Sequence, residues 1–423
     1  MQRYECRVGR VEADYTTYWM LSKMAWTATK LYNTAMWNAR KAWEDTGKIP
    51  TGFDLQKVVL ASPHHAYVPA HTYQHPAHQV WNAFKGWFAL RKKDPTANPP
   101  GFRKKEEGSS FLFTQYGFRV VDKNTVTLTL TDEFKEQIAY PNKRLTLRLK
   151  WNTPFPDEGV IQQIEVVPRK GFFEVHAKVA LPEPKWKKKG QVVAVDLGMR
   201  NPIVSVDEKG HVDVFKGGAV LSDIHYWNKE KGRVQSKVMA QTKKKSSHAL
   251  RKMAKHGASQ VNQGIHALTS RFTELCVQRK VKEVVVGDLT GIKKEKNGQG
   301  KNWKDKASQN WQQFPVKKVV AQLGYKLARH GIRLFEQDER GTSRGRCCLC
   351  GCTDRSKLHR VKRGLFQCEN CGTTQNADIN GAGNQLVRYL RLDGLPFKSS
   401  SGCLAQPTIW TWNHHLWEAA TCP

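Results

Sequence analysis

The sequence contains no long hydrophobic run. No segment reaches the roughly 18 to 20 apolar residues that a membrane span needs, and the N-terminal residues lack the continuous apolar stretch of a signal peptide. There is also no internal repeat. These absences argue against a membrane-spanning protein, and we expect a cytosolic protein that has no membrane partner.

Acidic residues are scarce, with 37 Asp and Glu against 69 Lys and Arg, which gives a net charge of +32. This surplus predicts a polyanionic partner, because basic side chains displace condensed counterions from phosphate backbones. The alternatives are a membrane-surface binder and a basic protein with no particular partner. Two lysine runs are candidate nucleic-acid contacts, although each could equally be a solvated linker: Lys187, Lys188 and Lys189, and Lys243, Lys244 and Lys245.

The first part of the chain combines strand and helix patterns, which predicts an α+β protein of several domains. Alternating strand patterns in residues 1–15 and 100–184 predict a β-barrel, with a hairpin around Lys170-Gly171. Apolar residues at helical spacing predict a helical domain inserted at residues 16–99. Within it, the histidine-rich residues 64–78 are interpreted as a polar loop, because the histidine spacings are irregular.

The second part begins after a basic linker at residues 185–190. Residues 191–342 show three short strands and then strands alternating with helices, which is the order of the RNase H-like fold. A cysteine-rich segment, residues 343–372, is inserted near the end of this α/β core, and residues 373–390 complete it. Residues 391–423 form a tail that we interpret as disordered or docked on a partner.

Six of the ten cysteines lie between Cys347 and Cys371. Two CxxC pairs separated by 17 residues each direct two thiolates at one tetrahedral ion, a spacing typical of a zinc ribbon. A disulfide and an iron–sulfur cluster are the alternatives, and a reducing compartment favours the metal. Cys348 and Cys352 are interpreted as bystanders. The predicted ligands of one structural Zn²⁺ are Cys347, Cys350, Cys368 and Cys371.

Two aspartates are candidate catalytic residues. Asp196 ends the apolar strand VVAV next to Leu-Gly, and Asp378 lies among small residues in NADINGAGN. A carboxylate at the end of a central strand can hold divalent ions for hydrolysis of a phosphodiester. Taken alone, Asp196 could serve a turn and Asp378 could be an N-cap. Two-metal hydrolysis needs at least three converging carboxylates, so a neighbouring strand must supply a third.

Several segments resemble the transposon-encoded TnpB family and the related miniature type V CRISPR effectors. VVAVDLGMRNPIVSVD resembles the first RuvC motif of that family, and NADINGAGN resembles its third. Between them, TSRGRCCLCG and FQCENCG resemble the family's threonine-serine and zinc-ribbon segment. Upstream matches such as LYNTAMWNAR extend the resemblance over nearly the whole chain to about Leu390.

The resemblance implies a prokaryotic, RNA-guided DNA endonuclease with one RuvC site. A guide RNA would pair with one strand of double-stranded target DNA while the protein reads a short flanking motif. Two Mg²⁺ ions would be the catalytic cofactors, the β-barrel would be the wedge domain, and the helical insert would be the recognition domain. The ribbon would be of the target nucleic-acid-binding type. Monomers and dimers are both compatible with this resemblance.

The second RuvC motif departs from the family. The family carries Glu at the end of the fourth strand, just before Asp-Leu, whereas this chain has Gly287 in VVVGDL. We expect Glu339, at the end of IRLFEQDE, to supply the missing carboxylate, because the last strand should lie beside the fourth. Asp288 and Glu336 are the alternatives, and both should point to the opposite face of the sheet.

Two rival functions remain open at this point. Gly287 also suits a nuclease-inactive, RNA-guided DNA-binding repressor, which would tolerate loss of the acidic cluster. A DNA-only transposase of the RNase H-like type is the other rival, although such enzymes lack a ribbon between the last two catalytic motifs. Cleavage assays distinguish the endonuclease from the repressor. A defined RNA that copurifies with the protein distinguishes both of these from the transposase.

Overall fold

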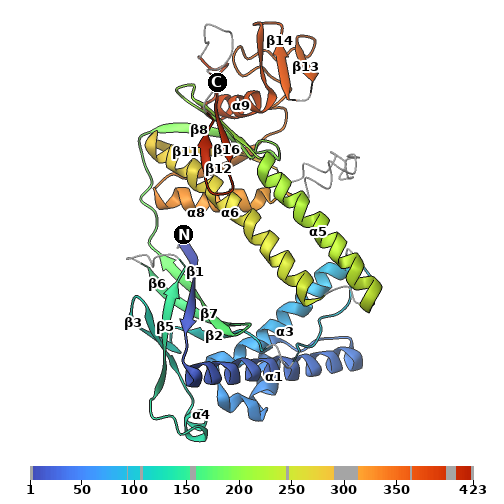
Figure 1. The fold of residues 1–423 in the computed structure, drawn as a ribbon, viewed down its shortest axis with the longest axis vertical. Helices are drawn as coiled ribbons and strands as arrows, with labels where there is room; N and C mark the ends of the chain where they lie inside the picture. Colours follow the sequence, from blue (N-terminus) through green and yellow to red (C-terminus); the bar gives the residue numbers. More distant parts are fainter. Residues whose placement is uncertain are drawn as a thin grey trace. The chain divides into compact units, whose positions relative to one another are not determined.

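The computed structural model describes residues 3–92, 94–104, 108–152, 159–243, 247–289, 313–362, 364–396 and 406–420. They fall into two compact units, Met1–Glu183 and Pro184–Pro423. Each unit has its own buried core. Figure 1 shows the elements along the chain.

Along the chain, the helices of the first unit come between its first and second strands, apart from the short α4. In α1, apolar residues such as Met20, Leu31 and Met36 recur at helical spacing and are completely buried. The helix begins after Asp14, whose side chain accepts from the Thr17 N–H. The helices are α1 (Tyr15–Thr46), α2 (Gly52–Leu60), the 3₁₀ helix η1 (Pro63–Tyr67), α3 (Ala70–Arg91) and α4 (Asp132–Gln137).

The histidine-rich segment is helical over much of its length, so its interpretation as a polar loop was wrong. η1 contains His64 and His65, and α3 begins at Ala70. The irregular histidine spacing misled because apolar residues further along α3, such as Val80 and Phe84, anchor the helix in the core. The packed face of a helix outweighs the polarity of its first turns.

The strands of the first unit form one antiparallel sheet of seven strands, in the order β2-β6-β7-β1-β5-β4-β3. The predicted hairpin joins β6 and β7, and Gly171 adopts a left-handed φ of 83° in its turn. Closure of this sheet into a barrel stays a prediction. The strands are β1 (Arg3–Glu12), β2 (Phe111–Thr114), β3 (Phe118–Asp122), β4 (Thr125–Thr129), β5 (Arg144–Trp151), β6 (Val160–Arg169) and β7 (Phe172–Leu181).

The second unit is built on a mixed sheet of seven strands in the order β12-β11-β8-β9-β10-β16-β17. The first three strands in sequence are antiparallel neighbours, whereas β11 pairs parallel to β8 and β12 pairs parallel to β11. The strands are β8 (Gln191–Asp196), β9 (Ile203–Asp207), β10 (Val212–Lys216), β11 (Val281–Asp288), β12 (Arg333–Asp338), β16 (Thr408–Trp412) and β17 (Trp417–Ala419).

Helices cover both faces of this sheet. Val193, Val195 and Val286 pack with α6 and α8 on one face. Val192, Ala194 and Val285 pack with α9 on the other, because successive strand side chains alternate between faces. In Figure 1 the long helices α5 and α6 run side by side. The helices are α5 (Gly218–Thr242), α6 (His248–Gln278), α8 (Val316–Arg329) and α9 (Ala377–Leu390).

A small sheet of three strands, β13-β14-β15, lies between β12 and α9 in sequence. The second CxxC pair lies beside this sheet: Cys368 ends β14, and Cys371 comes shortly before β15. We call residues 343–376 the ribbon segment. Its strands are β13 (Leu358–Lys362), β14 (Leu365–Cys368) and β15 (Thr373–Asn376).

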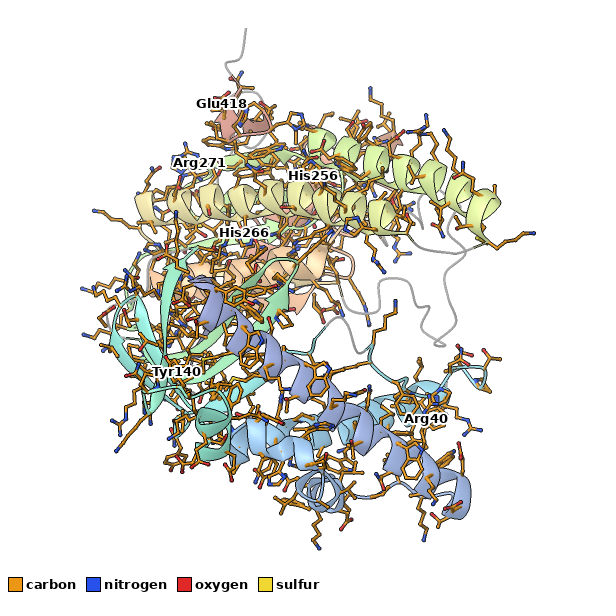
Figure 2. The ribbon with its side chains drawn as sticks, turned by 60° about the horizontal axis from the view of Figure 1, so that its bottom comes forward. Arg40, Tyr140, His256, His266, Arg271 and Glu418 are labelled. Carbon is orange, nitrogen blue, oxygen red and sulfur yellow. The ribbon has the colours of Figure 1, made fainter. Side chains whose placement is uncertain are left out.

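The C-terminal segment, interpreted from the sequence as a tail, contributes β16 and β17 to the main sheet. β16 pairs parallel to β10, and the Trp410 ring stacks on Phe215 at a centroid distance of 5.6 Å. Trp417 donates from Nε1 to the Gly264 carbonyl on α6. Figure 2 shows Arg271 of α6 near Glu418 of β17, and both line a cavity of about 500 Å³.

Among the described residues, no helix combines the length and the apolar character that crossing a membrane requires.

Candidate carboxylate site and cysteine cluster

Asp196 ends β8 on the face that α9 covers. Its strand neighbours on that face, Val192 and Ala194, pack with α9. The helix comes very close at Gly381, where an added Cβ atom would lie 3.2 Å from Asp196 Cγ. Glycine at this position therefore allows α9 to lie directly over the carboxylate.

Asp378 lies in the first turn of α9, near Asp196. The N-cap of the helix is Asn376, whose side chain accepts from the Asp378 N–H, so Asp378 itself does not cap the helix. Asn201 donates from Nδ2 to Asp378 Oδ2 at 2.7 Å. The sequence analysis did not single out Asn201, although its place shortly after Asp196 in LGMRNP was a usable signal.

Glu339 follows β12 and lies in front of Gly287. A Cβ atom placed on Gly287 would come within 2.5 Å of Glu339 Oε2 and 2.9 Å of Glu339 Cβ. The carboxylate of Glu339 therefore occupies space that a side chain at position 287 would otherwise take. The carboxylate in this space therefore comes from the residue that follows the neighbouring strand β12.

The two alternative acids lie on the other face of the sheet. Glu336 is paired in register with Val286, which packs against α6 and α8, and Glu336 is exposed. Asp288 follows Gly287 and alternates with it, so it also points away from the α9 face. It remains close enough for its charge to act on Glu339.

The negative charges of the other two predicted carboxylates act on Asp196. Burial raises the pKa of Asp196 well above its usual value, and the negative charges of Asp378 and Glu339 raise it further. Arg360, on β13, lowers the Asp196 pKa in opposition to them. Burial first, and then Asp288 and Asp338, raise the pKa of Glu339 to about 7. Carboxylates crowded in this way favour a cation between them.

The start of the ribbon segment is fixed to α9 by two asparagines. Asn384 donates from Nδ2 to the carbonyls of Thr342 and Arg346 at 2.6 and 2.7 Å. Asn380 donates to the Arg346 carbonyl at 2.8 Å and accepts from the Cys348 N–H. The Thr342 N–H and hydroxyl in turn donate to the Glu339 carbonyl. These bonds link Glu339, the ribbon segment and the helix that carries Asp378.

The four predicted zinc ligands form a compact cluster. The Sγ atoms of Cys347, Cys350, Cys368 and Cys371 all lie within 4.8 Å of one another. Cys347 and Cys371 are 3.7 Å apart at Sγ, as are Cys350 and Cys368. Zn–S bonds of about 2.3 Å in a tetrahedron place sulfurs roughly 3.8 Å apart, whereas a disulfide needs about 2.05 Å. The donor set and its spacing fit a closed zinc site.

The two remaining cysteines of the segment lie outside this cluster. Cys348 is buried against α9, where an added Cβ on Gly383 would meet it at 2.8 Å, and its Sγ accepts from Gln375 Nε2. The Cys352 carbonyl accepts from the Cys347 N–H, so it shapes the knuckle through its backbone.

The candidate lysines lie in irregular or terminal positions. Lys188 and Lys189 are exposed just before β8, whereas Lys187 is half-buried and its N–H donates to the Gly331 carbonyl. Lys243 is exposed at the C-terminus of α5. Lys244 and Lys245 lie outside the described residues.

These parts define a multidomain α/β protein that combines a carboxylate cluster with a four-cysteine ribbon. Residues 173–293 match a family model described as a probable transposase, OrfB_IS605. Residues 317–385 match the model of the Cas12f1-like TNB domain. These matches confirm the predicted resemblance to the TnpB family and the miniature type V effectors.

Among solved structures, the chain is similar to a cryo-EM structure of a Cas12f1-sgRNA-target DNA complex. The TM-score is 0.51 at 12% identity, over 86% of this chain and 81% of that chain. The mini-RNA-guided endonuclease CRISPR-Cas_phi3 gives a TM-score of 0.43 at 10% identity, over 93% of each chain. The first of these similarities supports the multidomain α/β fold. No curated protein sequence matches the chain.

Proposed function

We propose that this chain is an RNA-guided DNA endonuclease that hydrolyses both strands of its target in one RuvC-like site. The observation that carries the proposal is the position of Glu339, whose carboxylate fills the space in front of Gly287 on the face that also holds Asp196. The negative charges of Asp378 and Glu339 both act on Asp196, which supports a shared site despite the departure in the second motif. Asp196 and Gly287 lie within the first family match, and Glu339 and Asp378 lie within the second, which supports the same interpretation.

Asp196, Glu339 and Asp378 would hold two Mg²⁺ ions. Carboxylate oxygens are the donors that Mg²⁺ prefers. Burial first, and neighbouring negative charges second, raise the pKa of Asp196 and of Glu339, and a bound cation would relieve the repulsion among these charges. When bound, the ions activate the attacking water and stabilise the leaving oxygen.

The chain's own residues prepare this site. Asn201 holds one oxygen of Asp378 and leaves the other available. Gly381 lets α9 approach Asp196, and the charge of Asp378, in the first turn of that helix, acts on Asp196. Thr342 fixes the backbone of Glu339 through two hydrogen bonds, which limits how far its side chain can move. Arg360 supplies a positive charge near the carboxylates, where it would favour the approach of a phosphate.

Guide RNA and double-stranded target DNA are the proposed partners. The net charge of +32 suits them, and the structure of similar fold is a complex with sgRNA and target DNA. The exposed Lys188, Lys189 and Lys243 are candidate backbone contacts. Within the first unit, the sheet would act as the wedge and the helices as the recognition domain. The zinc ion would be structural, holding the ribbon segment that bears Arg360.

The test compares single substitutions in the complex with guide RNA, target DNA and Mg²⁺. We expect Asp196→Ala, Asp378→Ala and Glu339→Gln each to lower the cleavage rate at least about 100-fold, equivalent to ~2.7 kcal/mol. Glu336→Gln is the matched control, and it should retain cleavage because this acid lies on the opposite face and does not act on the charge of Glu339. Full activity of Glu339→Gln would falsify the placement of the third carboxylate.

A guide-programmed repressor that does not cut is the second candidate, and Gly287 is the observation that favours it. Unmutated protein that binds guide and target tightly, but leaves the DNA intact with Mg²⁺, would establish this function instead. A DNA-only transposase would be indicated if the purified protein carried no defined RNA and acted on DNA without a guide.

A further inference from the structure

Gln385 is a completely buried glutamine whose amide group has no partner in the part of the chain that the structure describes. It lies on α9, two turns after Asp378, and its exposed fraction is 0%. Neither Oε1 nor Nε2 has a hydrogen-bond partner among the described residues. An amide left unpaired in the interior destabilises the fold, because it has lost its hydrogen bonds to water. Both polar atoms of the side chain are therefore available to bind a ligand.

The unpaired amide points into the space in front of Gly287. A Cβ atom on Gly287 would lie 2.8 Å from Gln385 Nε2 and 2.5 Å from Glu339 Oε2. The amide nitrogen and the carboxylate therefore share the volume that glycine leaves open. The backbone of Gln385 is held at this level by Gln337, which pairs in register with Gly287 and donates to the Gln385 carbonyl at 2.8 Å.

The chemistry of an amide suits this position. A glutamine brings a donor for one oxygen of Glu339 and an acceptor for a water, yet it adds no charge to a group of three carboxylates that already repel one another. A leucine would fill a similar volume without donating, and a glutamate would add a fourth negative charge.

We propose that Gln385 is a positioning residue of the carboxylate site: when a divalent cation binds, the amide nitrogen would turn to donate to the Glu339 carboxylate, and the amide oxygen would accept from a water of that cation. This inference rests on the proposed function, because it takes the site to be a cation site. It explains how a carboxylate from β12 is kept in the space that the β11 residue leaves empty.

The test measures Mn²⁺ binding to the full-length, zinc-loaded protein after removal of copurifying nucleic acid. Electron paramagnetic resonance or calorimetry gives the affinity, and thermal unfolding without Mn²⁺ reports the fold. We expect Gln385→Leu to weaken Mn²⁺ binding about 10- to 100-fold, as for other outer-shell partners of metal ligands. The unfolding midpoint without the ion should stay the same or rise, because the substitution removes an unpaired buried amide.

Two further variants make the outcome decisive. Gln385→Met keeps the length and flexibility without the donor, and it replaces the leucine variant if that one fails to fold. Gln322→Leu is the matched control: Gln322 is also buried, but it lies on α8, where it accepts from Thr269. It should lose thermal stability and bind Mn²⁺ normally.

The possible results separate this inference from the proposed function. Wild-type affinity in both Gln385 variants, together with weak binding in Glu339→Gln, would overturn the role of Gln385 and leave the carboxylate site standing. Wild-type affinity in Glu339→Gln as well would overturn the site itself.

Discussion

At the scale of single residues, the relation between Gly287 and Glu339 determines whether the site is complete. The two positions lie on neighbouring parallel strands, and their side-chain spaces overlap. A side chain at 287 and the present position of Glu339 exclude one another. A carboxylate is therefore available to the site from one strand or from the other, but not from both at once.

This exclusion predicts the behaviour of a double variant. Gly287→Glu alone should lower cleavage, because its Cβ would collide with the Glu339 carboxylate. Glu339→Gly should lose at least about 100-fold. Combining it with Gly287→Glu should regain at least about tenfold over Glu339→Gly, because glycine at position 339 also removes the Cβ atom that would lie 2.9 Å from the new one, and the end of Gln385 can move aside. Rates of target cleavage measure the effect, and full activity of Gly287→Glu alone would contradict the overlap.

The raised pKa of Glu339 predicts how pH acts on the metal-free protein. Its folded pKa of about 7 exceeds the ordinary 4.5, so the protonated form stabilises the fold below pH 4.5. That stabilisation is lost as the pH rises through about 7. Mg²⁺ needs the ionised carboxylate, so the rise in unfolding midpoint on adding Mg²⁺ should grow from pH 6 to pH 8. Glu339→Gln should flatten this dependence, whereas Glu336→Gln should leave it unchanged.

At the scale of elements, α9 organises the second unit. It brings Asp378 to Asp196, places Gln385 in front of Gly287, and binds the start of the ribbon segment through Asn380 and Asn384. Two of the three proposed ligands, Glu339 and Asp378, lie immediately before and after that segment. Their separation in sequence is bridged by hydrogen bonds between the helix and the loop that follows Glu339.

The Asn384→Ala variant tests this link. It leaves the carbonyl of Thr342 with a single long side-chain hydrogen bond, from Asn380 at 3.4 Å. The free energy of unfolding should therefore fall by roughly 1–3 kcal/mol. Hydrogen exchange at residues 339–346 should accelerate. Asn38→Ala is the control, because Asn38 donates to a helix carbonyl in the first unit. Unchanged exchange at residues 339–346 would show that α9 does not hold Glu339.

At the scale of the whole molecule, the chain consists of two compact units, each with its own core. The cysteine cluster belongs to the second unit, where its cysteines are part of the core that packs against α9. Damage to the cluster should therefore spread to the carboxylate site before it reaches the first unit.

Zinc removal should show this division. Zinc binding contributes directly to the folding of such segments, so Cys368→Ser, or treatment with a chelator, should abolish cleavage and increase hydrogen exchange around Glu339 and Asp378. Exchange in β1, β6 and β7 should not change. Cys6→Ser is the control, because Cys6 is an exposed cysteine of the first unit. Normal exchange at both acids after zinc loss would rule out this coupling.

Local patterns predicted several features correctly. The 3.6-residue period of α1, the hairpin at Gly171 and the two CxxC pairs are encoded within short stretches of sequence. The alternation of strand side chains predicts Glu336 and Asp288 on the face away from Asp196, and the pairing of Glu336 with Val286 supports this for Glu336. The C-terminal strands were not predicted, because the parallel pairing of β16 with β10 joins segments far apart in the chain and leaves no local signal.

The sequence by itself determined the charge that favours a polyanion, the four cysteines that could hold a metal ion and the presence of two aspartates that suit a hydrolytic site. Only the tertiary structure decided that Glu339 occupies the space at Gly287 and that the unpaired amide of Gln385 shares it. The physical reason is that ligand spacing in a knuckle is a property of neighbouring residues. The meeting of β11, β12 and α9 instead depends on register and packing between distant segments.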